Sequence, residues 1–235
     1  ASYDGRPVKI MEVCGTHTAA IFNTGLRSII SPHIHLISGP GCPVCVTAPS
    51  YIDKLISLAN VPNTCVLTFG DMLKVRGTEL SLNEARAGGA NVKMAYSPFA
   101  ALKMAKQETE MQFVFAAVGF ETTIPAYTLV LEELINSEIS NLKLLTACKQ
   151  IIPAMEFICT NEQGIDAFLC PGHVSVITGA DGYRFLANKY HKPFVVAGFS
   201  GEHLLSAIGE IMKQVQQQKY LTFNMYAEAV KPLGN

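Results

Sequence analysis

The segment Val8-Lys-Ile-Met-Glu-Val-Cys-Gly-Thr-His-Thr18 shows the pattern that decides the fold. A short apolar run ends in a loop that carries a cysteine and a histidine, and a helical stretch follows. The same order recurs along the chain, and it is typical of parallel sheets with helices on both faces. The predicted strands are Val8–Val13, Ile34–Ile37, Thr64–Phe69, Val92–Tyr96, Phe113–Val118, Leu142–Thr146, Ala167–Leu169 and Phe194–Ala197.

Several predicted helices have recognisable start signals. Ser97 precedes a proline at the first helical position, Ser81 and Glu84 have the spacing of a capping box, and Pro153 is expected to open a helix over Ala154–Cys159. These signals support an α/β protein with helices between its strands.

Eight strands would make one large open sheet, so we predict two three-layer α/β units with mainly parallel sheets that face a shared cleft. The predicted first unit spans residues 1–100 and carries the Cys14 and Cys42/Cys45 loops. The predicted second unit spans residues 101–235 and carries the Glu121 and His173 loops. The chain shows no sequence repeat.

The composition limits the possible functions. The 235 residues are 49% hydrophobic and 16% charged, enough to bury a large core, and the formal net charge is −1. Interspersed charges of both signs argue against nucleic acid and anionic membranes as partners. We expect a cytoplasmic protein, because no apolar run is long enough to span a membrane. Seven cysteines without a small-domain disulfide pattern favour reduced thiols with metal or redox roles.

The chemically unusual residues follow predicted strands. In open parallel sheets, ligands gather at the carboxyl ends of the strands, where loops and helix N-termini meet. The four segments that follow strands in this way are Cys14-Gly-Thr-His17, Cys42-Pro-Val-Cys45, Gly119-Phe-Glu-Thr-Thr123 and Cys170-Pro-Gly-His173. We therefore expect four polar loops to line one cleft.

Cys42-Pro-Val-Cys45 is the strongest local signal. Two cysteines at this spacing can form a disulfide or share a metal ion, and a helix directly after them would favour the thiolate of the first. Two buried thiols that share the spacing by chance are the alternative. The prolines and glycines around the pair, which build a constrained turn, argue against that alternative.

Cys14 and His17 form the second candidate site. A thiolate suits iron, copper or zinc, while an imidazole can ligate a metal, donate a hydrogen bond or carry a proton. Capping and packing would be the structural alternative for such a pair on its own. Its combination with the dithiol favours a functional site.

Three further residues have more than one open interpretation each. Glu121 can serve as a proton donor, support a neighbouring group, or simply stabilise a helix N-terminus, and Asp71 has the same alternatives. His173 can face the cleft or cap a helix. The remaining apolar-run cysteines, Cys65, Cys148 and Cys159, are predicted to pack in the core.

Four motifs together resemble the HypD family of hydrogenase maturation proteins: Glu12-Val-Cys-Gly-Thr-His-Thr18, Ser38-Gly-Pro-Gly-Cys-Pro-Val-Cys-Val-Thr47, Gly119-Phe-Glu-Thr-Thr123 and Cys170-Pro-Gly-His-Val-Ser175. The resemblance runs over nearly the whole chain. It implies a cytoplasmic scaffold with redox activity that, together with HypC, holds the iron on which the Fe(CN)2CO unit of [NiFe]-hydrogenases is assembled. Cyanide would come from HypE with HypF, and the finished unit would pass toward the hydrogenase large subunit precursor.

The resemblance also implies roles for single residues. Cys14 corresponds to the iron-site thiolate with His17 beside it, Cys42 and Cys45 to the redox-active dithiol, and Glu121 and His173 to motifs that border the cleft. Family members continue into a cysteine-rich region that carries a [4Fe–4S] cluster. This sequence has no cysteine after Cys170, so we expect the cluster to be absent from this chain.

Two other classes of function remain open. The first is a thiol–disulfide oxidoreductase in which Cys42 attacks and Cys45 resolves. The second is a zinc-binding structural or interaction protein that uses Cys14, His17, Cys42 and Cys45, because three thiolates and one imidazole suit tetrahedral zinc.

Overall fold

The chain folds into two α/β units, each with its own parallel sheet. A computed structural model describes residues 3–235. Unit 1 consists of Ala1–Cys42 and Gln150–Asn235, and unit 2 consists of Pro43–Lys149. The second unit is thus an insertion into the first, and the chain passes between the units twice.

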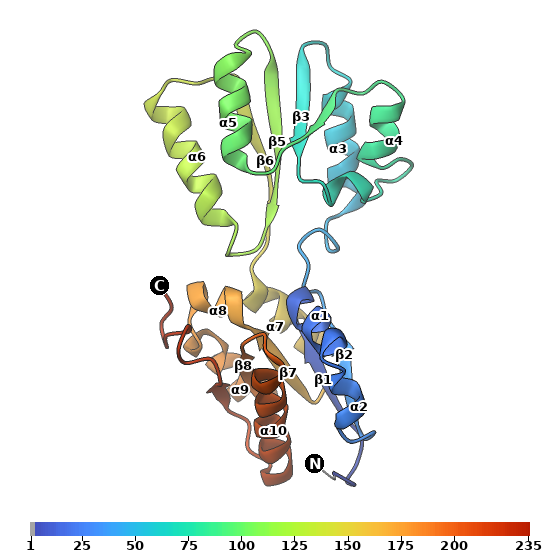
Figure 1. The fold of residues 1–235 in the computed structure, drawn as a ribbon, viewed down its shortest axis with the longest axis vertical. Helices are drawn as coiled ribbons and strands as arrows, with labels where there is room; N and C mark the ends of the chain where they lie inside the picture. Colours follow the sequence, from blue (N-terminus) through green and yellow to red (C-terminus); the bar gives the residue numbers. More distant parts are fainter. Residues whose placement is uncertain (1–2) are drawn as a thin grey trace. The chain divides into compact units, whose positions relative to one another are not determined.

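Unit 1 has a five-stranded sheet in the order β2-β1-β7-β8-β9, and all its strand pairs are parallel (Figure 1). Its strands are β1 (Val8–Glu12), β2 (Ile34–Ser38), β7 (Ala167–Pro171), β8 (Phe194–Ala197) and β9 (Thr222–Asn224). Its α-helices are α1 (Gly15–Asn23), α2 (Leu26–Ile29), α7 (Ile151–Asn161), α8 (Gly172–Thr178), α9 (Arg184–Tyr190) and α10 (Gly201–Gln217), and the 3-10 turn η2 covers Asp181–Tyr183.

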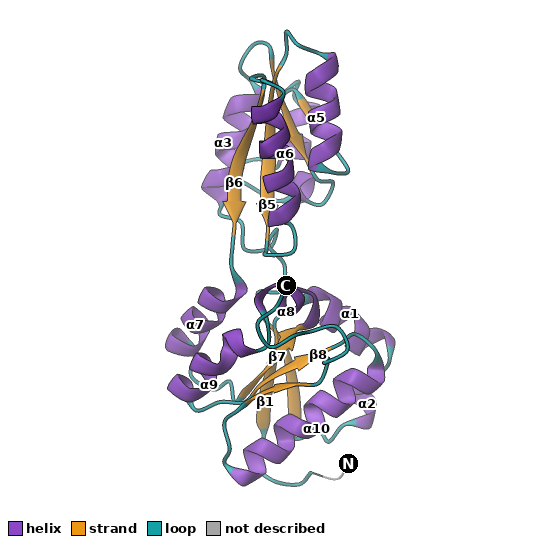
Figure 2. Ribbon diagram, turned by 90° about the vertical axis from the view of Figure 1, so that its left-hand side faces the viewer, coloured by secondary structure: helices purple, strands orange, loops and turns teal. Residues whose placement is uncertain are grey.

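Helices cover both faces of this sheet, as Figure 2 shows for α7 and α9 on one side and α1, α2 and α10 on the other. The α10 side buries a core that includes Ile10, Leu169, Val195 and Ile208. Every residue of β7 and β8 is buried, which explains why these central strands appear in the sequence as continuous apolar runs. The three-layer arrangement predicted from the sequence is confirmed for this unit.

Unit 2 has a four-stranded parallel sheet in the order β4-β3-β5-β6. Its strands are β3 (Thr64–Thr68), β4 (Val92–Met94), β5 (Gln112–Gly119) and β6 (Leu142–Cys148). Its α-helices are α3 (Pro49–Ala59), α4 (Leu82–Ala87), α5 (Pro98–Gln107) and α6 (Ile124–Asn136), and the 3-10 turn η1 covers Met72–Lys74.

Alternate residues of the strands in unit 2 pack into two separate cores, one on each face of the sheet. Phe113 and Phe115 pack under α5 and α6, whereas Val66 and Val118 pack under α3 and α4, on opposite sides of the sheet in Figure 1. Such alternation follows from the two-residue period of a strand. The three-layer prediction therefore holds for this unit too.

The units do not follow the predicted division into residues 1–100 and 101–235. β1 pairs with β7 of the same sheet, although most of the chain between them forms unit 2. Strand order is set by long-range pairing, and local sequence patterns carry no signal for it. β9 was also missed, because its three residues form no apolar run.

The helix start signals are mostly confirmed. Ser97 caps α5, and Ser81 and Glu84 form a capping box at α4, with both hydrogen bonds present. Pro153 does not open its helix, since α7 begins two residues earlier at Ile151. Within residues 3–235, no helix is both long enough and apolar enough to cross a membrane.

Candidate functional site

The strand order of unit 1 defines where a ligand should bind. Counted within the unit, the strand order is 2-1-3-4-5, which is a doubly wound arrangement. Its switch point lies between β1 and β7, where the strand order reverses. Ligands bind at this switch point, outside the carboxyl ends of the two strands. Cys14 lies two residues after β1, and His173 lies two residues after β7. The predicted position of these residues at strand ends is therefore confirmed.

Cys14 is the N-cap residue of α1 and is partly exposed. Its backbone is extended, and its side chain makes no capping hydrogen bond to the helix. The thiol is therefore not used for capping. The positive end of the helix dipole lies beside it, which suits an anionic sulfur.

The loop that leads to the dithiol packs directly on Cys14. Gly39 donates a hydrogen bond from its backbone nitrogen to the carbonyl oxygen of Glu12, at 2.7 Å. A Cβ atom on Gly41 would lie 2.5 Å from the backbone nitrogen of Cys14, closer than real contacts allow. Only glycine permits this approach, which places Cys42, the next residue, beside Cys14.

The dithiol occupies the turn where the chain leaves unit 1 for unit 2, since the boundary falls between Cys42 and Pro43. Neither cysteine is in a disulfide; Cys42 is partly exposed and Cys45 is exposed. Thr47 stabilises the turn by donating from its hydroxyl to the carbonyl oxygen of Pro43 at 2.9 Å. The expectation of a helix directly after the pair is wrong, because α3 begins only at Pro49.

His17 is fully buried in the first turn of α1. Its Nε2 lies 3.1 Å from the carbonyl oxygen of Ala197 at the end of β8, so a neutral ring protonated at Nε2 donates to that oxygen. Burial lowers the pKa of His17 to about 4, although hydrogen bonds to the backbone of Ala197 and Gly198 oppose the shift. His17 is therefore neutral at physiological pH.

His173 is exposed at the start of α8 and stacks on Phe199, with ring centroids 4.0 Å apart. Phe199 also contacts the ring of His17, at 5.0 Å. The structure thus brings both predicted histidines to one aromatic residue that the sequence analysis missed. In the sequence, Phe199 is one more apolar residue near the end of a strand, and no local signal distinguishes it.

Glu12 is a second residue that the sequence analysis missed as a site component. This carboxylate at the end of β1 is fully buried and accepts a hydrogen bond from Ser38 Oγ at 2.9 Å. A guanidinium nitrogen of Arg27 lies 3.6 Å from Oε1 of Glu12. Burial raises the pKa of Glu12, while Ser38 and Arg27 oppose the shift. A glutamate within an apolar strand run was the signal that could have drawn attention to it.

Glu121 and Asp71 belong to unit 2, whose strand order places its own switch point between β3 and β5. Glu121 is buried and stands three residues before α6, whose first turn contains no acidic residue. The role of Glu121 therefore stays a prediction. Asp71 instead accepts a hydrogen bond from the backbone nitrogen of Met72 at 2.9 Å, which confirms the capping interpretation for this residue.

The other cysteines differ in exposure. Cys65 and Cys170 are fully buried, and burial raises the pKa of both thiols. Cys159 is partly exposed, whereas Cys148 is exposed. The prediction of a buried Cys148 is wrong, because β6 is an edge strand and Cys148 is its last residue.

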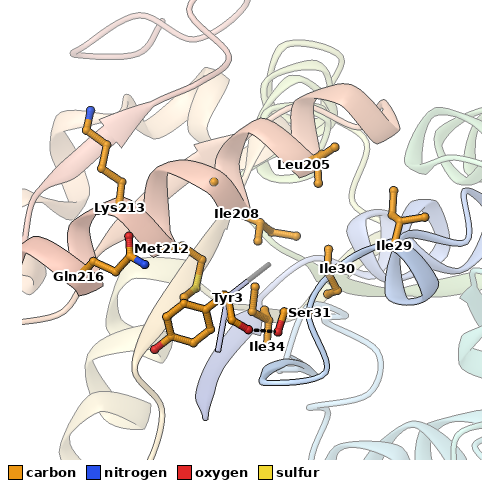
Figure 3. Close-up of a pocket in the computed structure, with 11 residues that line it drawn as sticks. Tyr3, Ile29, Ile30, Ser31, Ile34, Leu205, Ile208, Met212, Lys213 and Gln216 are labelled. Carbon is orange, nitrogen blue, oxygen red and sulfur yellow. Dashed lines mark hydrogen bonds between the residues drawn. The ribbon is translucent and has the colours of Figure 1, made fainter. Parts of the chain in front are cut away.

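A separate cavity of about 440 Å³ lies in unit 1, between α10 and the start of β2 (Figure 3). Ile34, the first residue of β2, lines it together with Ile208 and Met212 of α10. Because β1 and β2 are parallel, this cavity lies at the opposite edge of the sheet from Cys14. It does not belong to the candidate site.

Comparison with known proteins finds the same family that the four sequence motifs resemble. The HypD family model, described as "Hydrogenase formation hypA family", matches residues 1–235. The chain belongs to the HypD family.

Curated HypD relatives match nearly all of this chain. The HypD hydrogenase maturation factors of Escherichia coli strain K12 and Rhodobacter capsulatus are each 39% identical to it, over 231 and 233 residues. A Methanocaldococcus jannaschii protein named for hydrogenase expression and formation is 45% identical over 228 residues. These alignments cover 97% to 98% of this chain but only 61% to 63% of each relative. The chain therefore spans less than two thirds of the length of these HypD relatives.

The resemblance implies a [4Fe–4S] cluster in the cysteine-rich region of the family, and such a cluster needs four grouped thiolates. Among residues 3–235, no group of three His, Cys, Asp or Glu side chains lies close enough together to hold a metal ion.

The buried His17 predicts a specific pH dependence of stability. Its pKa is lowered from 6.5 to about 4 in the folded chain, so the unfolded chain binds a proton at higher pH than the folded chain does. Stability is therefore fully present above about pH 6.5 and is lost as the pH falls toward 4. Between pH 7 and pH 5 the free energy of unfolding should drop by about 2 kcal/mol from this residue alone.

Urea unfolding of the wild type and of His17→Gln at both pH values measures this contribution. The drop between pH 7 and pH 5 should be smaller in the variant by about that amount. An equal drop in both proteins would contradict the burial of a neutral His17.

Proposed function

We propose that this chain holds iron while the Fe(CN)2CO unit of [NiFe]-hydrogenases is assembled. Cys14 supplies the thiolate that binds the iron, which is the substrate of assembly. The observation that carries this proposal is the uncapped, partly exposed Cys14 at the switch point of unit 1, with the dithiol loop packed on its backbone. A soft thiolate suits low-spin iron that carries cyanide and carbon monoxide.

The Cys42/Cys45 dithiol supplies electrons in this proposal. When two thiols close to a disulfide, two electrons and two protons are released, and the same number is taken up when the disulfide reopens, so the pair can supply electrons in one direction and accept them in the other. Neither sulfur is in a disulfide, and the exposed Cys45 can be reached by a reductant that resets the pair. The residues between the two cysteines form a turn, and no helix or strand there would prevent the two sulfurs from forming a disulfide.

The remaining site residues complete the proposal. His17 and His173 are the proposed site residues beside Cys14 in unit 1, and Glu121 is the proposed site residue of the Gly119–Thr123 motif in unit 2. HypC is the proposed partner in holding the iron, HypE with HypF supplies cyanide, and the hydrogenase large subunit precursor receives the unit, all in the cytoplasm. Membership of a hydrogenase formation family supports this assignment.

Thiol–disulfide oxidoreduction is the second candidate function. The exposure of Cys45 beside a partly exposed Cys42 favours it, because an incoming disulfide can reach the pair. The zinc alternative would use Nδ1 of His17, since Nε2 is engaged with the carbonyl oxygen of Ala197.

Serine substitutions in the dithiol should change redox behaviour more than stability. Cys42→Ser and Cys45→Ser each leave a single thiol that cannot close an intramolecular disulfide, whereas the turn keeps its Thr47 hydrogen bond. We expect loss of the two-electron titration against a glutathione buffer and a change in the free energy of unfolding below about 1 kcal/mol. A loss of several kcal/mol in both variants would instead indicate a structural metal site.

Infrared spectroscopy tests the proposed function. The chain is produced without oxygen together with HypC, HypE and HypF, purified, and examined for cyanide and carbonyl stretching bands. Bands that stay with the chain support the proposal. Their absence, when a longer HypD relative treated in the same way shows them, would contradict it for this chain and favour dithiol chemistry.

A further inference from the structure

An aromatic layer covers the carboxyl edge of unit 1. We use this name for His17, His173, Phe199 and Tyr226, whose rings contact one another around Phe199. His17 follows β1, His173 follows β7, Phe199 follows β8 and Tyr226 follows β9. The layer therefore links four strand ends and includes the switch point between β1 and β7.

Phe199 is the centre of this layer. Its ring stacks on His173 with centroids 4.0 Å apart and planes inclined by 30°, and it meets His17 at 5.0 Å. Tyr226 contacts it edge to face at 6.1 Å. The edge-to-face contact with Tyr226 is one of the preferred arrangements of aromatic pairs, and Phe199 is in contact with three rings in all.

Gly172 shows how closely the layer lies on the strand ends. A Cβ atom there would lie 2.6 Å from the carbonyl oxygen of Ala197, 3.0 Å from Tyr226 and 3.2 Å from Phe199. The residue directly before His173 thus has no room for a side chain. The Phe199 ring is packed against the backbone that carries His173 as well as against its imidazole.

The two histidines depend on Phe199 to different degrees. His17 is buried and is already fixed by its contact with the carbonyl oxygen of Ala197. His173 is exposed, and among the described residues it is the Phe199 ring that its imidazole contacts. Stacking restrains rotation of the imidazole but leaves both ring nitrogens at its edge, where they can donate or accept hydrogen bonds.

We propose that Phe199 is a positioning residue that holds the His173 imidazole in one orientation at the iron site. The inference rests on the proposed function, because His173 acts at that site only if iron is bound there. Phe199 touches neither the iron nor its ligands in this account. It acts through His173, and the property it supplies is the flat face on which the imidazole stacks.

Three substitutions separate this role from plain packing. Phe199→Leu keeps an apolar side chain but removes the aromatic face, whereas Phe199→Tyr keeps the face. Phe185→Leu is the matched control, because Phe185 is a half-exposed phenylalanine in α9 of the same unit. Cooperative urea unfolding of each variant shows which of them fold.

The first readout is the chemical shift of the His173 ring protons in the iron-free chain, assigned with His173→Gln. Phe199→Leu should move these signals toward the values of a freely rotating histidine, because the ring current of Phe199 is lost. Phe199→Tyr and Phe185→Leu should leave them close to wild type. Unchanged His173 signals in Phe199→Leu would overturn the proposal.

The second readout is the infrared yield of the iron unit per chain. We expect Phe199→Leu to lower it roughly tenfold, as displaced site groups commonly do, and Phe199→Tyr to restore it. A shifted His173 signal with full yield would overturn the positioning role while leaving the iron scaffold intact. If even the wild type shows no bands, the proposed function fails, and so does a role for Phe199 in it, whatever the ring shifts are.

Discussion

Replacing Cys14 by alanine should abolish retention of the iron unit while leaving the folded chain intact. Cys14 makes no side-chain capping bond and is partly exposed, so its sulfur contributes little to packing. If this thiolate is the protein ligand to the iron, its loss removes the bond that holds the unit. We expect iron content to fall to background and the free energy of unfolding to change by less than about 1 kcal/mol.

Cys159→Ala is the matched control for this substitution. Cys159 is also a partly exposed free thiol of unit 1, but it lies in α7, outside the switch point. Iron content, measured after anaerobic purification with the partner proteins, should stay at the wild-type level in this variant. Iron retained by Cys14→Ala, or lost to the same extent from both variants, would refute the assignment.

Replacing Gly41 by alanine should have the second largest effect. The new methyl group would lie 2.5 Å from the nitrogen, 2.6 Å from the Cα and 2.8 Å from the carbonyl carbon of Cys14. All three are backbone atoms, so the loop that carries Cys42 must move away from Cys14. We expect a loss of about 1 to 3 kcal/mol in the free energy of unfolding, together with strongly reduced iron retention.

Gly15→Ala provides the control for this effect. Gly15 is the residue after Cys14, but a Cβ atom there meets nothing within 4 Å. This variant should unfold at the wild-type urea concentration or higher, since alanine favours a helix. Equal behaviour of Gly41→Ala and Gly15→Ala in urea unfolding would show that the two cysteine loops are not in close contact.

Much of the fold was predictable because central parallel strands are buried on both faces. β3 and β7 are buried at every residue, so each appears as a short apolar run between turn residues. The Ser81–Glu84 capping box was predictable for a different reason, because both of its hydrogen bonds form within one helical turn. Local interactions of this kind can be recognised in a single sequence.

The insertion of unit 2 into unit 1 could not be predicted in the same way. It depends on the pairing of Ile10 with Ala167, more than 150 residues apart, and nothing local specifies such a partner. The exposure of Cys148 has a similar cause, since only the sheet order makes β6 an edge strand. A boundary drawn at residue 100 therefore cuts through unit 2.

The candidate site also contains some residues that could be predicted from local sequence and others that could not. Cys14 and His173 were predicted because they follow strands, and the topology places both strands at the switch point. Phe199 was missed because its role depends on ring contacts across three strand ends. Glu12 was missed because it lies inside a predicted strand, although a buried carboxylate needs the partners that Ser38 and Arg27 provide.

X-ray absorption at the iron edge of the loaded chain, compared with the Cys14→Ser variant, tests most directly whether Cys14 holds the iron. We expect a sulfur atom bound to iron in the wild type and its replacement by an oxygen or nitrogen atom, or loss of the iron, in the variant. An iron site without sulfur in the wild type, or an unchanged sulfur contribution in Cys14→Ser, would contradict the claim that Cys14 holds the iron.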